Sequence, residues 1–272
     1  MGDTILLKVE GLHKTFSDKA FADKPVLNGV DLVLRRGERL SILGPGGSGK
    51  STLLKVIIGL IRPDGGRIEM LGTDLLTADR QTRSEVLRRA AMAFQLGGLF
   101  DFMNVRENIL FAMENMTDLL PSVMDERVAE LLQAVNLPHA ASKLPSELSG
   151  GMRRRVGIVR AMATAPELGL FDEPTAGLDP VTSTMVIDMI HQIAEKIGTA
   201  CLCVTSSVEV AFTFSERVAL LRDGRIAAMG DWDELQAVPD EWLRHFLNVR
   251  QFKPSRRTAT IKGRGTSATT DP

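Results

Sequence analysis

The first residues that could do chemistry are Gly44, Gly49, Lys50 and Ser51, in the spacing Gly-x-x-x-x-Gly-Lys-Ser. This spacing is typical of a loop that binds nucleotide phosphates, here Gly44, Pro45, Gly46, Gly47, Ser48, Gly49, Lys50, Ser51 and Thr52. Glycines let backbone N–H groups turn toward phosphate oxygens, and the positive end of a following helix points at the same anion. Lys50 would reach the β- and γ-phosphates, and the Ser51 hydroxyl would bind Mg²⁺. The alternative is a glycine-rich turn between a strand and a helix that binds nothing.

A second group lies at the end of an apolar strand, where Leu168–Phe171 is followed by Asp172 and Glu173. In phosphoryl transfer, an acidic strand end beside a phosphate loop holds Mg²⁺, which is the role we expect for Asp172. Glu173 would then act as general base toward the attacking water. The alternative is a strand that ends in a solvated acidic turn, and the phosphate loop elsewhere in the chain favours the functional interpretation.

Alternating strands and helices must position both groups. The strands expected in a mainly parallel sheet are Arg39–Leu43, Ala90–Phe94, Glu167–Phe171, Thr199–Thr205 and Arg217–Leu221. Strands Ile5–Val9, Val26–Leu34 and Arg67–Leu71 predict an N-terminal, partly antiparallel sheet. Helices are expected from about Lys50 to Leu60, at Pro180–Ile197 and within Asp231–Val249, and the helical stretch Val105–Val135 interrupts the alternation as an insertion.

The composition is that of an ordinary globular protein, with 44% hydrophobic and 25% charged residues in 272. The net charge of −1 argues against general nucleic-acid binding. No apolar run approaches the ~18–20 residues that span a bilayer, and the N-terminus lacks the layout of a signal peptide. Cys201 and Cys203 stand one residue apart in an apolar run, so we expect small core residues in a reducing cytoplasm rather than a disulfide.

The last residues differ from the rest. Residues 253–272 are polar, basic and poor in large apolar side chains, so we expect a disordered tail behind a domain at 1–252. A solubilising tail is the simplest interpretation. Contact with anionic lipid headgroups, or with an opposite subunit, are the alternatives.

Further motifs resemble the ATP-binding cassette (ABC) family over about residues 5–250. These are Gln95 after a strand, the signature Leu148-Ser149-Gly150-Gly151-Met152, the segment Gly177-Leu178-Asp179 and the aromatic Phe16. The resemblance implies an α/β fold: a RecA-like P-loop NTPase core, an N-terminal antiparallel β-subdomain and a helical subdomain inserted at about 96–155. It also implies an ATPase that pairs head to tail as a homodimer, with each ATP between the phosphate loop of one copy and Ser149, Gly150 and Gly151 of the other.

The same resemblance implies roles for single residues. Phe16 would stack on adenine, Gln95 would contact Mg²⁺ and the reacting water, and Asp179 would lie at the paired nucleotide site. The signature form LSGGM, the segment FQLGGLFDFMNV and the preceding LPSE are most similar to the ATPases of MCE-type (Mla-like) phospholipid transport systems. The implied partners are a membrane permease, an MCE lipid-binding protein and a STAS-domain subunit, at the cytoplasmic face of the inner membrane. A cassette for another cargo is the alternative.

One position departs from the family. Most members carry a histidine after the strand Thr199–Thr205 that contacts the γ-phosphate, whereas this chain has Ser206. A serine hydroxyl can donate a hydrogen bond, but it is shorter and cannot become cationic. Two functions therefore stay open: a transport ATPase, and an ATP-gated assembly or regulatory module with slowed hydrolysis.

Overall fold

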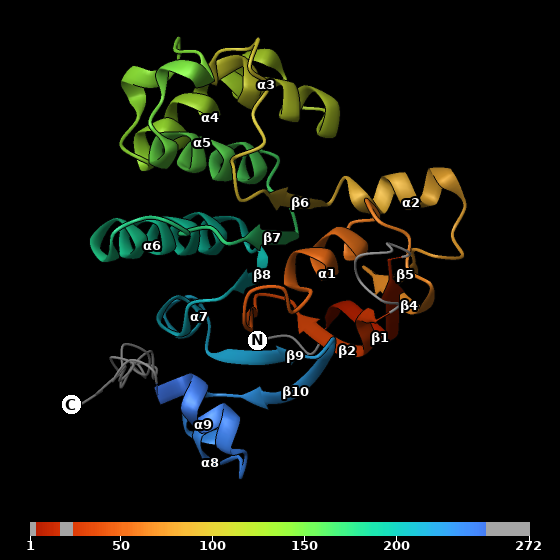
Figure 1. Cartoon of the computed structure of the whole chain (residues 1–272). Coiled ribbons are helices and arrows are strands. Elements are labelled where there is room, and N and C mark those ends of the chain that lie inside the picture. Colours follow the sequence, from red (N-terminus) through yellow and green to blue (C-terminus); the bar gives the residue numbers. More distant parts are fainter. Residues whose placement is uncertain (1–3, 17–23, 249–272) are drawn as a thin grey trace, which may run out of the picture.

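Six strands form the central sheet in the order β10-β9-β3-β8-β7-β6 (Figure 1). They are β3 (Arg39–Leu43), β6 (Ala90–Ala93), β7 (Leu168–Asp172), β8 (Ala200–Thr205), β9 (Arg217–Arg222) and β10 (Arg225–Gly230). Neighbours from β9 to β6 pair in parallel, and only β10 pairs antiparallel with β9. This computed structural model describes residues 4–16 and 24–248, and the expected tail at 253–272 lies outside them.

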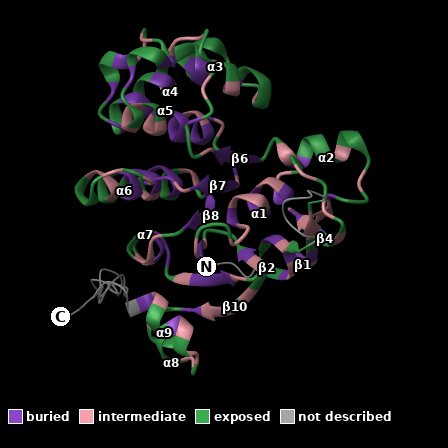
Figure 2. Ribbon diagram, viewed as in Figure 1, coloured by how far each residue is buried: buried purple, intermediate pink, exposed green. Residues whose placement is uncertain are grey.

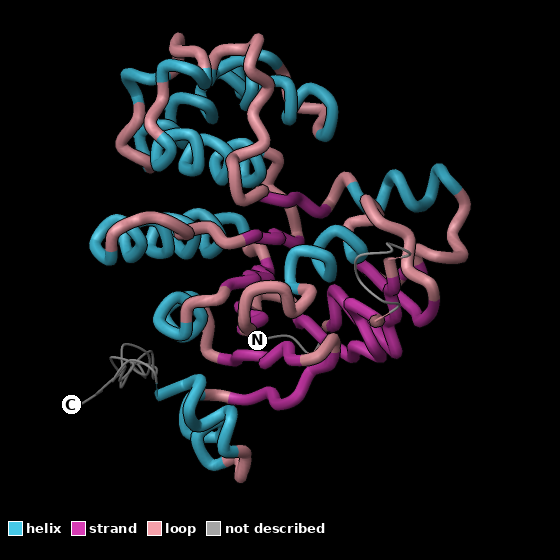
Figure 3. Tube along the Cα trace, viewed as in Figure 1, coloured by secondary structure: helices cyan, strands magenta, loops and turns pink. Residues whose placement is uncertain are grey.

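A second sheet covers part of the first and is fully antiparallel where its strands pair. Its order is β2-β1-β4-β5, with β1 (Ile5–Thr15), β2 (Pro25–Arg35), β4 (Gly65–Met70) and β5 (Thr73–Asp74). Both sheets confirm the predicted fold class of a mainly parallel core with an N-terminal antiparallel subdomain. The tube in Figure 3 shows the two groups of strands and the separate helical layer.

The described helices are α1 (Lys50–Ile57), α2 (Arg80–Leu87), α3 (Val105–Met116), α4 (Pro121–Ala134), α5 (Gly150–Ala163), α6 (Pro180–Ile197), α7 (Val208–Phe214), α8 (Trp232–Ala237) and α9 (Glu241–Asn248). Two short 3₁₀ turns, η1 (Pro138–Ala140) and η2 (Pro145–Glu147), precede α5. Helix α1 ends three residues earlier than expected because Gly59 adopts a φ of 77°. There the N–H of Leu60 bonds to the carbonyl of Lys55 at 2.8 Å, which closes the helix in a Schellman turn.

Strand β8 shows how the core is divided. Its side chains alternate, so Ala200, Leu202 and Val204 pack with α1 and the N-terminal sheet. Cys201 and Cys203 pack with α5, α6 and α7 on the opposite face. Both cysteines are free and buried, and burial raises the pKa of the Cys201 thiol to about 12, which confirms their interpretation as core residues. Figure 2 shows this buried stripe running through the sheet between exposed helix faces.

The inserted helices α3, α4 and α5 form a layer beyond β6 and β7 (Figure 1). Asn104 and Glu107 cap α3 reciprocally, and Ile109 and Met113 of that helix are fully buried against the rest of the layer. Helix α5 continues through residue 155, where the inserted subdomain was expected to end. Within residues 4–16 and 24–248, no helix has both the length and the apolar character needed to cross a bilayer.

Candidate functional site

The predicted phosphate loop lies between β3 and α1, and close packing shapes it. A Cβ atom at Gly44 would lie 2.4 Å from the carbonyl oxygen of Leu221. At Gly49, where φ is 99°, a Cβ would lie 2.7 Å from the carbonyl oxygen of Val26. No side chain caps the N-terminus of α1, so its first N–H groups are free for an anion.

Lys50 is held inside this loop. Its Nζ donates hydrogen bonds to the carbonyl oxygens of Gly44 and Pro45, both at 2.9 Å. Burial lowers the pKa of Lys50, while the charges of Glu173 and Asp172 oppose that shift. The buried Oγ of Ser48 has no hydrogen-bond partner among the described residues. A phosphate oxygen in the loop would supply that partner, so the loop fits the ligand that the sequence predicts.

The structure brings two of the three predicted magnesium ligands together. The Ser51 Oγ donates a hydrogen bond to Oδ1 of Asp172 at 2.8 Å, although the residues are 121 positions apart in sequence. Asp172 is 5% exposed and ends β7, whose register against β8 fixes its place. Hydroxyl and carboxylate oxygens are the donors that Mg²⁺ prefers, and phosphates and water complete such sites. The pair therefore suits a magnesium ion bound with a nucleotide.

Glu173 has an unusual backbone and a doubly held side chain. Its φ of 47° lies in the left-handed region, and its N–H donates to the carbonyl oxygen of Val204 at 3.0 Å. The carboxylate accepts one hydrogen bond from Oγ1 of Thr205 at 3.0 Å and one from the backbone N–H of Ser206 at 2.8 Å. Ser206 thus lies beside Glu173 and contacts it through its backbone N–H and not through its hydroxyl.

Gln95 follows β6 in an exposed loop that presses against α5. The Arg154 Nε donates to the carbonyl oxygen of Gln95 at 3.2 Å. A Cβ at Gly157 would lie 2.5 Å from the Cα of Gly97, so these two backbones touch with no side chain between them. The described contacts do not join the Gln95 side chain to Ser51 or Asp172, so its expected metal role stays a prediction.

The signature residues form the start of α5. The Ser149 Oγ accepts the N–H of Met152 at 3.2 Å and caps the helix. Gly150 is exposed, and a Cβ there would meet nothing within 4 Å, whereas one at Gly151 would meet Leu178 at 3.3 Å. In Figure 1, β6 and β7 lie between α5, which begins at the signature, and α1, which follows the phosphate loop.

Asp179 and Phe16 lie at element ends. Asp179 caps α6 by accepting hydrogen bonds from the N–H and hydroxyl of Thr182, which lower the pKa of its carboxyl group. Phe16 follows β1 and is 38% exposed, with the Lys14 Nζ 5.4 Å from its ring centroid. An exposed ring face of this kind is available for stacking on a base.

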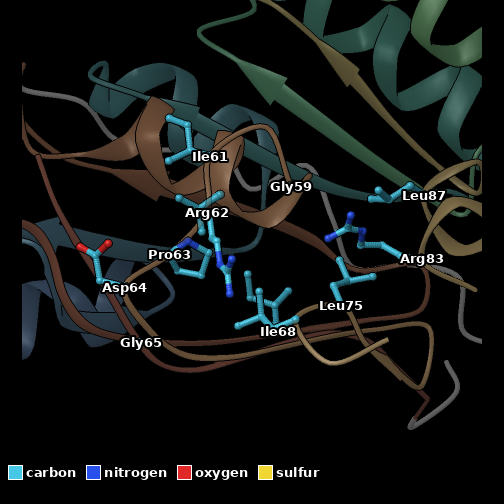
Figure 4. Close-up of a pocket in the computed structure, with 12 residues that line it drawn as sticks. Gly59, Ile61, Arg62, Pro63, Asp64, Gly65, Ile68, Leu75, Arg83 and Leu87 are labelled. Atoms are coloured by element: carbon cyan, nitrogen blue, oxygen red, sulfur yellow. The ribbon is translucent and has the colours of Figure 1, made fainter. Parts of the chain in front are cut away.

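A pocket of about 400 Å³ lies at the other end of α1, away from the phosphate loop (Figure 4). It is lined mainly by apolar side chains and two arginines: Val56, Gly59, Ile61, Arg62, Pro63, Asp64, Gly65, Ile68, Leu75, Leu76, Arg83 and Leu87. Asp64 accepts hydrogen bonds from the Lys14 Nζ at 2.8 Å and the Thr15 N–H at 2.6 Å. The pocket contains none of the predicted site residues, but it adjoins the strand end that carries Phe16.

Sequence reasoning missed two contributors to the site. Thr205 holds Glu173, and its only sequence signal is its place at the end of a strand next to the acidic one. Gly157 lets the Gln95 loop approach α5, and a glycine inside a helix is the signal that could have found it.

Comparison with known proteins agrees with this geometry. A family profile described as "ABC transporter" matches residues 27–176. The chain is 37% identical over 223 residues to the intermembrane phospholipid transport system ATP-binding protein MlaF of Escherichia coli K12, covering 82% of this chain and 83% of that protein. It is 35% identical over 251 residues to the probable ribonucleotide transport ATP-binding protein mkl of Mycobacterium leprae, covering 92% of this chain and 71% of that protein.

Solved structures give the same result. The dimeric post-hydrolysis state of an ATP-binding cassette bound to ADP and Pi superposes with a TM-score of 0.76 and 29% sequence identity. That match covers 83% of this chain and 98% of the other. The phosphate loop, the acidic strand end and these matches together show that the chain belongs to the ABC transporter family, as an ATP-binding ATPase subunit.

Proposed function

We propose that the chain drives phospholipid transport between membranes, as the ATPase of an MCE-type system. The observation that supports this cargo is the similarity to MlaF, which spans 82% of this chain. The LSGGM signature and the FQLGGLFDFMNV segment support the same assignment. The similarity to mkl, whose name states ribonucleotide transport, makes another cargo the competing outcome.

The site residues divide the work of hydrolysis. Lys50 and the backbone N–H groups around it would bind the β- and γ-phosphates. Ser51, Asp172 and Gln95 would hold Mg²⁺, which would neutralise developing charge when bound. Glu173 accepts a proton from the attacking water as the water oxygen bonds to the γ-phosphorus and the bond to the β–γ bridging oxygen breaks. Ser149, Gly150 and Gly151 of a second copy close over the γ-phosphate.

An exposed apolar surface suits contact with a permease. We call Phe100, Phe102 and Phe111 the aromatic patch, and Leu96 is a further exposed apolar residue in the Gln95 loop. Leu96 is 83% and Phe102 77% exposed, and the Phe100 ring lies 5.0 Å from Phe111 and 5.7 Å from Phe102 between centroids. Phe100 and Phe102 lie in the segment between Gln95 and α3, and Phe111 lies in α3. A permease bound to Leu96 and this patch, at the cytoplasmic face of the inner membrane, would act on the Gln95 loop.

A second function has one observation in its favour. The Ser206 side chain makes no hydrogen bond to any described residue, so it adds no side-chain contact at Glu173. A site that binds MgATP but turns it over slowly would serve as an ATP-gated clamp rather than as a motor.

The test is transport by the purified complex of this chain with its permease, reconstituted in vesicles. We expect ATP-dependent transfer of a fluorescent phospholipid to acceptor vesicles, with Glu173→Gln as the control that binds ATP without transfer. Phosphate release accelerated by phospholipid supports the motor. Acceleration by ribonucleotides instead would assign the other cargo, and ATP-stabilised assembly without phosphate release would support the clamp.

A further inference from the structure

Thr205, the last residue of β8, has a side-chain hydroxyl that contacts Glu173. Thr205 is 1% exposed, and its Oγ1 donates to Oε2 of Glu173 at 3.0 Å. The same Oγ1 accepts the N–H of Ser207, the N-cap residue of α7, at 3.1 Å. A hydroxyl has one proton, so accepting from Ser207 leaves that proton for Glu173. The direction of the Thr205 hydrogen bond is thereby set by the backbone.

The other carboxylate oxygen is held as well. Oε1 of Glu173 accepts the N–H of Ser206 at 2.8 Å, so consecutive residues hold both oxygens. The β-branch of Thr205 restricts its χ1, and its backbone is fixed by pairing with Leu43 in β3. Each carboxylate oxygen keeps a free lone pair, so a water molecule can still bind. The arrangement therefore orients Glu173 without using up its capacity as a base.

Glu173 needs such support because its own backbone is uncommon. A φ of 47° is unfavourable for a residue with a Cβ and persists only where surrounding contacts impose it. The Ser206 contact comes from the backbone, which every residue type supplies, and the Ser206 hydroxyl adds none to the described residues. Thr205 is thus the one side chain that donates to the Glu173 carboxylate in the part of the chain described.

We propose that Thr205 is a positioning residue, which holds the Glu173 carboxylate in line for water activation. This inference rests on the proposed role of Glu173 as general base. We expect Thr205 to affect the rate of hydrolysis and not the binding of MgATP, because its hydroxyl bonds to Glu173. Thr205 meets the phosphate loop through its backbone carbonyl, which accepts the N–H of Gly44 at 3.3 Å and is retained in side-chain variants.

The experiment compares Thr205→Val with Thr205→Ser in the full-length chain. Valine keeps the shape and removes the hydroxyl, whereas serine keeps the hydroxyl. We expect Thr205→Val to lower the single-turnover rate of MgATP hydrolysis about 10- to 100-fold, the range typical of a misplaced catalytic group. The Kd for MgATP should change less than about twofold, and Thr205→Ser should retain most of the rate.

A double variant separates positioning from a general loss of structure. In a Glu173→Gln background, Thr205→Val should slow hydrolysis no further, because the residue it positions is already disabled. Thr205→Ala repeats the test if the valine variant does not fold. If Thr205→Val hydrolyses MgATP at the native rate while Glu173→Gln is slow, the inference about Thr205 is overturned and the role of Glu173 as general base stands. Equal losses of rate and MgATP affinity, without rescue by serine, also overturn it. Unimpaired hydrolysis by Glu173→Gln removes the proposed base and the inference with it.

Discussion

The phosphate loop and the signature residues at the start of α5 are expected to bind the same ligand, but an added side chain would meet different surroundings at their glycines. At Gly44 and Gly49, an added Cβ would collide with backbone carbonyl oxygens of the same chain. At Gly150, an added Cβ would meet nothing, and φ is not positive. The chain itself therefore demands glycine at positions 44 and 49, whereas no described residue of the chain demands it at position 150. This contrast is what a nucleotide site shared between two copies would produce.

The largest effect should come from Lys50→Ala, in the half of the site that one chain completes. Removing the buried ammonium leaves the phosphates without their charged partner, so MgATP affinity should fall at least about 100-fold. Isothermal titration of the isolated chain measures it, with the exposed Lys196→Ala as control. Tight MgATP binding by Lys50→Ala would contradict the contrast between the two regions, because the phosphate loop would then not be the part of the site that binds the nucleotide most strongly.

Gly49→Ala should impair folding and binding together. The positive φ and the 2.7 Å approach to Val26 predict a loss of about 1–3 kcal/mol in the free energy of unfolding. Denaturant unfolding without nucleotide measures this loss. Gly46→Ala, where a Cβ has open space, is the matched control within the same loop. An unfolding midpoint for Gly49→Ala equal to that of the native chain would show that the loop can shift without loss of stability.

Gly150→Ala should not lower the stability of the single chain and should weaken only the MgATP-driven association of two copies. Alanine at the first position of α5 costs no strain, and alanine favours helix more than glycine by up to about 1 kcal/mol. MgATP-driven dimerisation, measured by light scattering in the Glu173→Gln background, should weaken about 10-fold or more. Normal dimerisation would mean that no second molecule approaches Gly150 closely.

Ser206→His should have the smallest effect, an increase of a few-fold in the single-turnover rate. The backbone N–H of residue 206 would still hold Glu173, and an imidazole would add a longer donor toward the γ-phosphate. Rapid-quench measurement of phosphate compares the variant with the native chain. Equal rates would show that the serine costs nothing.

Strong periodic segments made most of the fold predictable. The bounds of β3 and α6 agree with the prediction, because apolar runs and caps mark them clearly. Helix α2 was not predicted, because only Val86 of its eight residues is buried and the helix therefore lacks an apolar periodicity. The Asp79 cap is its one clear signal in the sequence. Strand β10 was also not predicted, because it is an edge strand with only one buried residue, Gly230, among its six. Tertiary contact, rather than local pattern, determines such elements.

In the candidate site, the motifs predict that Ser51 and Asp172 lie together, and the structure places the Ser51 hydroxyl against the Asp172 carboxylate. The way Glu173 is held was not predictable, because a positive φ in a glutamate and a backbone contact from Ser206 leave no trace in residue types. Nor could spacing along the chain reveal that Gly97 and Gly157 touch. These features arise only when distant segments meet.

The contact between Gly97 and Gly157 also has a mechanical consequence. Where side chains lie between two segments, their rotamers can rearrange and absorb a small displacement of one segment before it reaches the other. Two peptide backbones in direct contact have almost no such compliance. A displacement of the loop at Leu96 would therefore be transmitted to α5 almost undiminished. A side chain larger than hydrogen at Gly97 or Gly157 would force the two backbones apart and change their relative position.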